Sequence, residues 1–242
     1  MDIAEALAAD AGLVCVVGAG GKKTTLYTLA NRLSRAIVTA TVRIPIFDAE
    51  VGDVVVTGDP VSALDSSHDW PLGLVAARKR EDRYEGYDPA IVDRLAAATD
   101  APVLVKADGA RTRLLKAPND REPQLPKTAD TVIPIASARA VGKPLAETHV
   151  HRPERVADVT GTALGHELTP VDVATILASE QGGLKGVPEG ATALPLINMV
   201  DTEALEAVAR EIADEVLART DVPRVVLAQM TSETPLVAVI ER

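Results

Sequence analysis

The chain has 242 residues, of which 47% are hydrophobic and only 2% aromatic, so Val, Leu, Ile and Ala must fill a sizeable buried core. Its net charge of −10 argues against a general nucleic-acid-binding protein, because such proteins need a basic face. No stretch approaches the ~18 apolar residues of a membrane span, and residues 1–12 lack the pattern of a signal peptide, so we expect a cytoplasmic protein that does not contact membranes.

The first predicted elements surround a glycine-rich turn. A short amphipathic helix over residues 2–10 leads into an apolar strand at 13–17, which contains the single cysteine, Cys15. We expect Cys15 to be a buried structural thiol rather than a nucleophile, because its neighbours are apolar. After the glycines, a segment with helical spacing runs over about 24–34. A strand, a glycine turn and a helix start form the context in which a glycine motif binds phosphate.

This turn predicts a phosphate-binding loop, because glycines let the backbone turn tightly and expose N–H groups beside a helix N-terminus. The match to G-x-x-x-x-G-K-[ST] is imperfect, since Gly18 lies only four residues before Lys22. Either Lys22 is the phosphate lysine with Thr24 displaced by one, or Lys23 and Thr24 are the working pair. The alternative is a simple strand–helix turn with two solvated lysines. The candidate nucleotide-binding residues here are Gly18, Ala19, Gly20, Gly21, Lys22, Lys23, Thr24 and Thr25.

The remaining elements alternate along the chain. Strands are predicted at residues 36–41, 53–57, 73–80, 102–107, 131–136, 193–197, 223–228 and, as an edge strand, 235–240. Helices are predicted at residues 89–98, 171–179 and 202–217. The strands at 53–57 and 73–80 have no helix between them, which suggests a small antiparallel excursion. The sequence therefore predicts an α/β fold, a mostly parallel sheet flanked by helices, in a single domain over 1–242 with an irregular insertion at about 139–190.

Ligands of such sheets bind at the carboxyl ends of the strands. Asp108 ends the strand at 102–107, where a magnesium-organising carboxylate belongs, and Arg111 would offset developing phosphate charge. Thr41 closes the strand at 36–41, and its hydroxyl is a further candidate metal ligand beside Thr24. The alternatives are a turn aspartate with a surface arginine, and ordinary β-branched strand residues.

Residues 198–201, Asn-Met-Val-Asp, resemble the N-K-x-D base-reading motif of GTPases with Met199 in the lysine position. A carboxylate at Asp201 can accept hydrogen bonds from guanine's ring N–H and exocyclic amine together, which adenine does not offer in that arrangement. The competing interpretation is that Asp201 or Thr202 caps the helix that follows. Base reading by Asn198 and Asp201 and helix capping are both compatible with the sequence.

A further polar cluster lies at residues 116–152. Two histidines in an H-x-H pattern, His149 and His151, would chelate a metal if their rings converge, but they make an incomplete zinc site. We interpret them, with Arg152, as a switch or partner surface; solvated loop residues are the alternative. Lys116, His149 and Arg152 would hold a small substrate if the protein transfers phosphate to one.

Six segments occur in an order and spacing that resemble the YqeC family, accessory proteins of selenium-dependent molybdenum hydroxylases. They are GAGGKKTTL, TATVRIP, KADGARTRLLKAP, VGKPLAETHVHRPE, LTPVDVATIL and LINMVD. The resemblance implies a fold similar to P-loop NTPases, a bound nucleotide and Mg²⁺, and a role in maturing molybdenum–pterin hydroxylases. Two positions depart from the family pattern: Lys23 stands where a threonine commonly follows the loop lysine, and Lys106 where an acid often precedes A-D-G-A.

We therefore expect a magnesium-dependent hydrolase of GTP or ATP whose protein client is a molybdenum hydroxylase or its maturation machinery. Lys22 or Lys23 would bind phosphate, Thr24 and Asp108 would organise magnesium, and Asn198 with Asp201 would select the base. Two other readings stay open. One is a P-loop transferase or ligase that activates a small substrate, and the other is a nucleotide-sensing chaperone or binding module without turnover.

Overall fold

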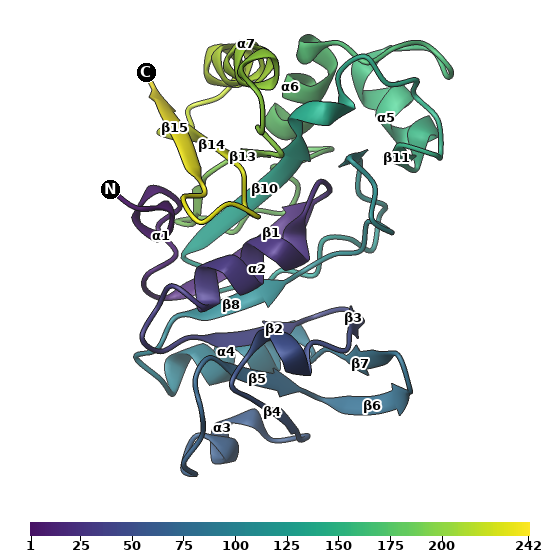
Figure 1. Ribbon diagram of the computed structural model, residues 1–242. Coiled ribbons are helices and arrows are strands. Elements are labelled where there is room, and N and C mark those ends of the chain that lie inside the picture. The colour runs from purple at the N-terminus through teal and green to yellow at the C-terminus, as the bar shows by residue number, and fades with distance from the viewer.

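A ten-stranded, mostly parallel sheet forms the centre of the computed structural model, which describes residues 1–242 (Figure 1). In spatial order its strands are β15 (Leu236–Glu241), β14 (Arg224–Ala228), β13 (Leu196–Asn198), β10 (Thr131–Ser137), β1 (Leu13–Gly18), β8 (Val103–Lys106), β2 (Ile37–Ala40), β5 (Leu72–Val75) and β4 (Asp53–Val56), with β12 (Thr192–Ala193) beside β10. Strand β15 lies at the edge of the sheet, as predicted, and it alone is antiparallel to its neighbour. The α/β fold predicted from the sequence is confirmed.

The helices are α1 (Ile3–Ala6), α2 (Lys22–Ala30), α3 (Pro60–Ala63), α4 (Pro89–Ala97), α5 (Pro153–Thr160), α6 (Pro170–Ala178) and α7 (Glu203–Arg219), with 3-10 turns at Asp48–Glu50 and Ala138–Ala140. Proline occupies the first turn of α3, α4, α5 and α6, where its missing N–H leaves no intrahelical bond unmade. None of these helices combines the length and the apolar character that crossing a membrane requires.

The sheet separates two layers of helices because its buried strands alternate their side chains. In β1, Val14 and Val16 pack with α1 and α2 on one face, while Cys15 and Val17 pack with α4 on the other. Helices α6 and α7 cover the rest of that second face (Figure 1). Cys15 is fully buried, and burial raises the pKa of its thiol, as expected for a structural cysteine.

Two small sheets lie outside the main one. An antiparallel sheet joins β3 (Ile44–Pro45), β7 (Arg83–Glu85) and β6 (Ala77–Arg80), and a parallel pair joins β9 (Leu115–Lys116) to β11 (Val150–His151). The segment 73–80, predicted as one strand, is divided: its first half is β5 in the main sheet and its second half is β6. The strand at 53–57 corresponds to β4, which pairs parallel to β5, so the antiparallel excursion is the β3–β7–β6 sheet instead.

The segment 139–190 contains one helix more than its sequence predicts. Helix α6 lies where helical spacing places it, but α5 was not expected. The N-cap of α5 is Arg152, in a left-handed conformation and without a side-chain hydrogen bond to the helix, so the usual capping signal is absent.

The connections on the two sides of β1 run in opposite directions, since β8 lies on one side and β10 on the other. This makes the carboxyl end of β1 a switch point, where ligands of open α/β sheets bind. The segments that follow β1, β8, β10 and β13 all lie at this edge of the sheet.

Candidate functional site

The turn between β1 and α2 requires glycine. Gly20 and Gly21 have φ angles of +99° and +121°, a region that side chains rarely adopt. A Cβ atom at Gly20 would lie 2.6 Å from the Ser137 nitrogen, and one at Gly21 would lie 2.4 Å from Asn198 Nδ2. The turn therefore packs directly on the carboxyl ends of β10 and β13.

The backbone amides of this turn fall into two groups. Those of Gly18, Ala19 and Gly20 donate to Asp108 Oδ2, the Ile135 carbonyl and the Arg113 carbonyl, each at 2.9 Å. No protein acceptor takes the amides of residues 21–24, and the N-cap Gly21 has no side chain to satisfy them. An anion would therefore bind at the start of α2 rather than against the first half of the turn.

Lys22 and Lys23 differ in their surroundings. The Lys22 ammonium is buried, donates to the Gly18 carbonyl and lies 2.9 Å from Asp108 Oδ1. Lys23 is half-buried and makes no ion pair. Thr24 lines the same cavity as Lys23, whereas the Thr25 hydroxyl is buried and donates to the Gly21 carbonyl at 3.1 Å.

Asp108 is the centre of a buried ion-pair network. Its Oδ2 lies 2.8 Å from Lys116 Nζ, and its Oδ1 has Lys22 as a neighbour but no hydrogen bond of good geometry. Burial alone would raise the pKa of Asp108, but Lys22 and Lys116 outweigh it and hold that pKa below its usual value. Asp108 is therefore ionised at neutral pH.

The network continues to a carboxylate that the sequence analysis missed, Glu122. Its Oε2 lies 3.0 Å from Lys116 Nζ and 2.6 Å from Arg152 Nη1. Lys116 also donates to the Gly109 carbonyl at 2.6 Å, and its side chain is fully buried. An unbroken series of ion pairs thus runs from Lys22 at the turn, through Asp108, Lys116 and Glu122, to Arg152. The pairing of β9 with β11 brings Lys116 beside His151 and Arg152.

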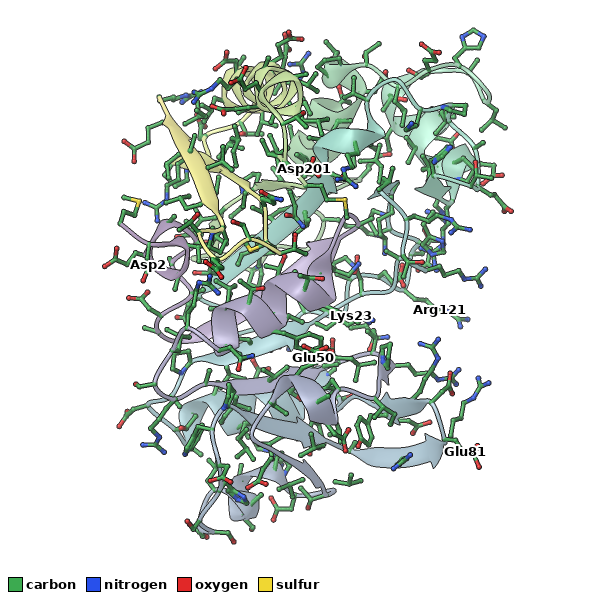
Figure 2. All side chains as sticks on the ribbon, in the orientation of Figure 1. Asp2, Lys23, Glu50, Glu81, Arg121 and Asp201 are labelled. Carbon is green, nitrogen blue, oxygen red and sulfur yellow. The ribbon has the colours of Figure 1, made fainter.

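A cavity of about 1000 Å³ opens on this network and on the start of α2. Figure 2 shows Lys23 and the tip of the β6–β7 hairpin, marked by Glu81, on the same side of the molecule. Glu122 is the single carboxylate among the lining residues, although the chain as a whole carries net charge −10. The cations that line the cavity are Lys22, Lys23, Arg43, Arg80, Arg83, Lys106, Arg111, Arg113 and Arg152.

Of the two histidines in the H-x-H pattern, only His151 lies at the cavity. His151 lines the cavity, and burial, followed by the Arg152 and Lys116 charges, lowers its pKa to about 4, so its ring is neutral at pH 7. His149 is not part of the lining; its carbonyl accepts from the Leu114 amide at 2.8 Å. No group of three or more His, Cys, Asp or Glu side chains is arranged to hold a metal ion.

The residues near Lys22 nevertheless fit Mg²⁺, because this ion keeps several waters and takes few ligands from the protein when phosphate supplies the others. Asp108 Oδ1 is a buried oxygen without a hydrogen bond, 2.9 Å from Lys22 Nζ and outside the lining of the cavity. The Thr24 hydroxyl lines the cavity and makes no hydrogen bond within the protein. Thr41 is not brought to this cavity; its hydroxyl donates to the Gln124 carbonyl at 2.6 Å.

Asn198 ends β13 and contacts the glycine turn, whereas Asp201 follows β13 and is not part of the cavity lining. Asn198 Nδ2 donates to the Gly20 carbonyl at 2.8 Å, and its Oδ1 accepts from the Met230 amide at 3.1 Å, so this side chain positions the glycine turn. Asp201 pairs with Arg139 through Oδ2, while its buried Oδ1 has no partner. The N-cap of α7 is Thr202, whose hydroxyl accepts from the Leu205 amide, so capping does not account for Asp201.

Two further side chains reach the cavity from this edge. Met199 lines it, and its sulfur accepts a hydrogen bond from the Ser137 hydroxyl at 3.0 Å. Arg111 is exposed, lines the cavity and lies three residues after Asp108 in a turn, where its φ angle is +47°.

Comparisons with known proteins identify relatives of this chain. A family model described as "YqeC protein" matches residues 14–154, which include the glycine turn and the complete ion-pair network but neither Asn198 nor Asp201. "Uncharacterized protein YqeC" of Escherichia coli (strain K12) is 29% identical over 233 residues, which cover 93% of this chain and 90% of that protein. No solved structure matches the chain.

Proposed function

The chain belongs to the YqeC family, and we propose that it is a magnesium-dependent nucleoside triphosphatase that assists the maturation of a molybdenum-cofactor hydroxylase. The observation that supports hydrolysis best is the start of α2, where unpaired amides at 21–24 and Lys22 line a cationic cavity. Asp108 is buried next to Lys22, outside the lining of that cavity. The role in maturation rests on the resemblance to the family.

In this proposal the phosphates bind at the amides of residues 21–24. Lys22 would exchange the Gly18 carbonyl and Asp108 for phosphate oxygens, and Arg111 would offset charge at the rim of the cavity. Asp108 and Thr24 would hold Mg²⁺, which neutralises phosphate charge when it is bound. Lys116 is too deeply buried to touch a substrate, so it acts by holding Asp108 and Glu122 in place.

The test of this function is phosphate release from GTP and ATP by the purified protein, with and without Mg²⁺. Release without any acceptor supports hydrolysis. Release that requires an added small molecule supports a transferase instead, and the size of the cavity favours this second candidate. Tight nucleotide binding without release would identify a sensing or chaperone module.

We expect Asp108→Asn to reduce hydrolysis by about 10²–10³-fold, the usual effect of removing one preorganised electrostatic group. Nucleotide affinity should fall by less than about tenfold, because the amides of α2 and Lys22 remain. The measurement is a magnesium titration of the hydrolysis rate at saturating nucleotide. A titration curve that matches the parent protein's would remove Asp108 from the metal site.

If Asp201 reads guanine, GTP should bind more tightly than ATP, and Asp201→Asn should reduce that preference by about ten- to a hundredfold, the equivalent of one charge-assisted hydrogen bond. The unpartnered Oδ1 of Asp201 motivates this expectation. Met199 brings no charge to the base, so discrimination in the parent should be weaker than in a GTPase with lysine there.

Thr202→Ala is the matched control, because Thr202 is the cap of α7. It should cost about 1 kcal/mol of stability and leave the choice of nucleotide unchanged. Calorimetry with both nucleotides and a melting temperature for each variant separate the two roles. Equal affinity of the parent for GTP and ATP would end the base-reading proposal.

A further inference from the structure

The cavity contains more positive charge than the glycine turn uses. Arg43 lies between β2 and β3, Arg80 and Arg83 lie on either side of the β6–β7 turn, and Lys106 ends β8. Strand β3, which follows Arg43, pairs with β7 through Pro45 and Arg83, and this pairing brings Arg43 close to the β6–β7 hairpin. We call these four residues the arginine subsite.

Lys106 is the buried member of this group. Its side chain donates to the Arg43 carbonyl at 2.9 Å and forms no ion pair with a carboxylate, although the residue is only 6% exposed. A buried amine that lacks an acidic partner is costly unless a ligand supplies the opposite charge.

The three arginines are also incompletely paired. Arg80 and Arg83 share one exposed carboxylate, Asp82, at 3.7 and 3.2 Å, and Arg43 is exposed without an acidic partner. The chain contains 35 Asp and Glu residues, so on an ordinary solvated surface we would expect some of them to lie among these cations. Their concentration around one cavity instead creates a field that attracts an anion.

The cavity has room for this second ligand. Its volume of about 1000 Å³ lies at the upper end of the roughly 300–1000 Å³ typical of small-molecule pockets. The cations that belong to the turn, Lys22 and Lys23, lie on α2. The arginine subsite lies on β8, on the small antiparallel sheet and on the segment that leads into that sheet. Two groups of cations on different elements therefore share one space.

We infer that the arginine subsite binds a second small molecule through a phosphate monoester, beside and independently of the ligand at the start of α2. Arginine suits this role because its planar group of donors matches phosphate oxygens two at a time. The inference goes beyond the proposed hydrolysis, since it makes the cavity a site for two ligands, and it does not require the first ligand to be a nucleotide.

The experiment is a calorimetric titration with sulfate at low ionic strength, since sulfate imitates a phosphate group. The parent should bind two sulfate ions. Arg43→Gln with Arg83→Gln should weaken one site by about a hundredfold, or tenfold for each arginine, and leave the other. Arg94→Gln with Arg210→Gln removes the same charge outside the cavity and should change neither site by more than about twofold.

Glycerol 3-phosphate should displace sulfate from the arginine subsite, and glycerol should not. Nucleotide titrations of the same proteins separate this inference from the proposed function: a parent that binds sulfate at the arginine subsite but no nucleotide would contradict only the latter. Two outcomes overturn the inference. One is two unchanged sulfate sites in the Arg43→Gln, Arg83→Gln variant, and the other is loss of sulfate and nucleotide together, which would mean that one ligand fills the whole cavity.

Discussion

Replacing both Lys22 and Lys23 with alanine is expected to lower nucleotide affinity at least about hundredfold, because each lysine removed costs a charge-assisted contact of about 1.5–3 kcal/mol. The single variants should differ. Lys22 lies inside the turn against the Gly18 carbonyl, beside the unpaired amides, whereas Lys23 points into the cavity from a half-buried position. We therefore expect Lys22→Ala to account for most of the loss.

Stability must be measured together with affinity for these variants, because Lys22→Ala also removes one of the two lysines that neutralise buried Asp108. Calorimetry should be carried out well below the melting temperature of each variant. Lys127→Ala, which removes an exposed lysine outside the cavity, is the control for net charge. A folded double variant that binds nucleotide as tightly as the parent would show that the turn is not a phosphate loop.

The sequence predicts the parts of this site that depend on local signals. A buried strand, three glycines and a helix start lie within sixteen consecutive residues, 13–28. Each of these features is recognisable from the local sequence, because apolar periodicity indicates the strand and the helix and glycine permits the tight turn. Asp108 is predictable because it follows a core strand, and carboxyl ends of parallel strands share one edge of the sheet. These inferences need no knowledge of how distant segments pair.

Residues whose role depends on distant pairings were missed for that reason. Glu122 lies in a polar loop without periodicity, and nothing in its neighbourhood distinguishes it from the acids at Asp120 and Glu147. Only the approach of Lys116 and Arg152 through β9 and β11 gives it a role. Likewise, Arg43 and Arg83 are forty residues apart and meet because β3 pairs with β7.

The ion-pair network gives the glycine turn a physical connection to Arg152. In the structure Asp108 is shared between Lys22 and Lys116, and Glu122 is shared between Lys116 and Arg152. If phosphate draws Lys22 away, Lys116 becomes the only lysine neutralising Asp108 and its interaction with Glu122 changes in turn. Lys116 is thus the residue on which both carboxylates depend.

Lys116→Met is therefore expected to destabilise the protein by about 3–5 kcal/mol, the usual cost of leaving buried charge uncompensated. Its side chain is fully buried, as is nearly all of Asp108, so solvent offers little screening. The measurement is urea denaturation at pH 7. The pKa of Asp108 is lowered in the folded protein, so its ion pairs stabilise the fold at any pH above the ordinary pKa of an aspartate. This stabilisation is lost only as the pH falls through the pKa of Asp108 in the folded protein, so it is fully present at pH 7.

Lys185→Met is the matched control, since Lys185 donates to a backbone carbonyl, that of Asn119, and to no carboxylate. It should cost about 1 kcal/mol, as one ordinary hydrogen bond does. Lys116→Met combined with Glu122→Gln should be more stable than Lys116→Met alone, because the second change removes one of the two carboxylates that lost a partner. A loss below about 1 kcal/mol for Lys116→Met, or no recovery in the combined variant, would show that Asp108 and Glu122 do not depend on this lysine.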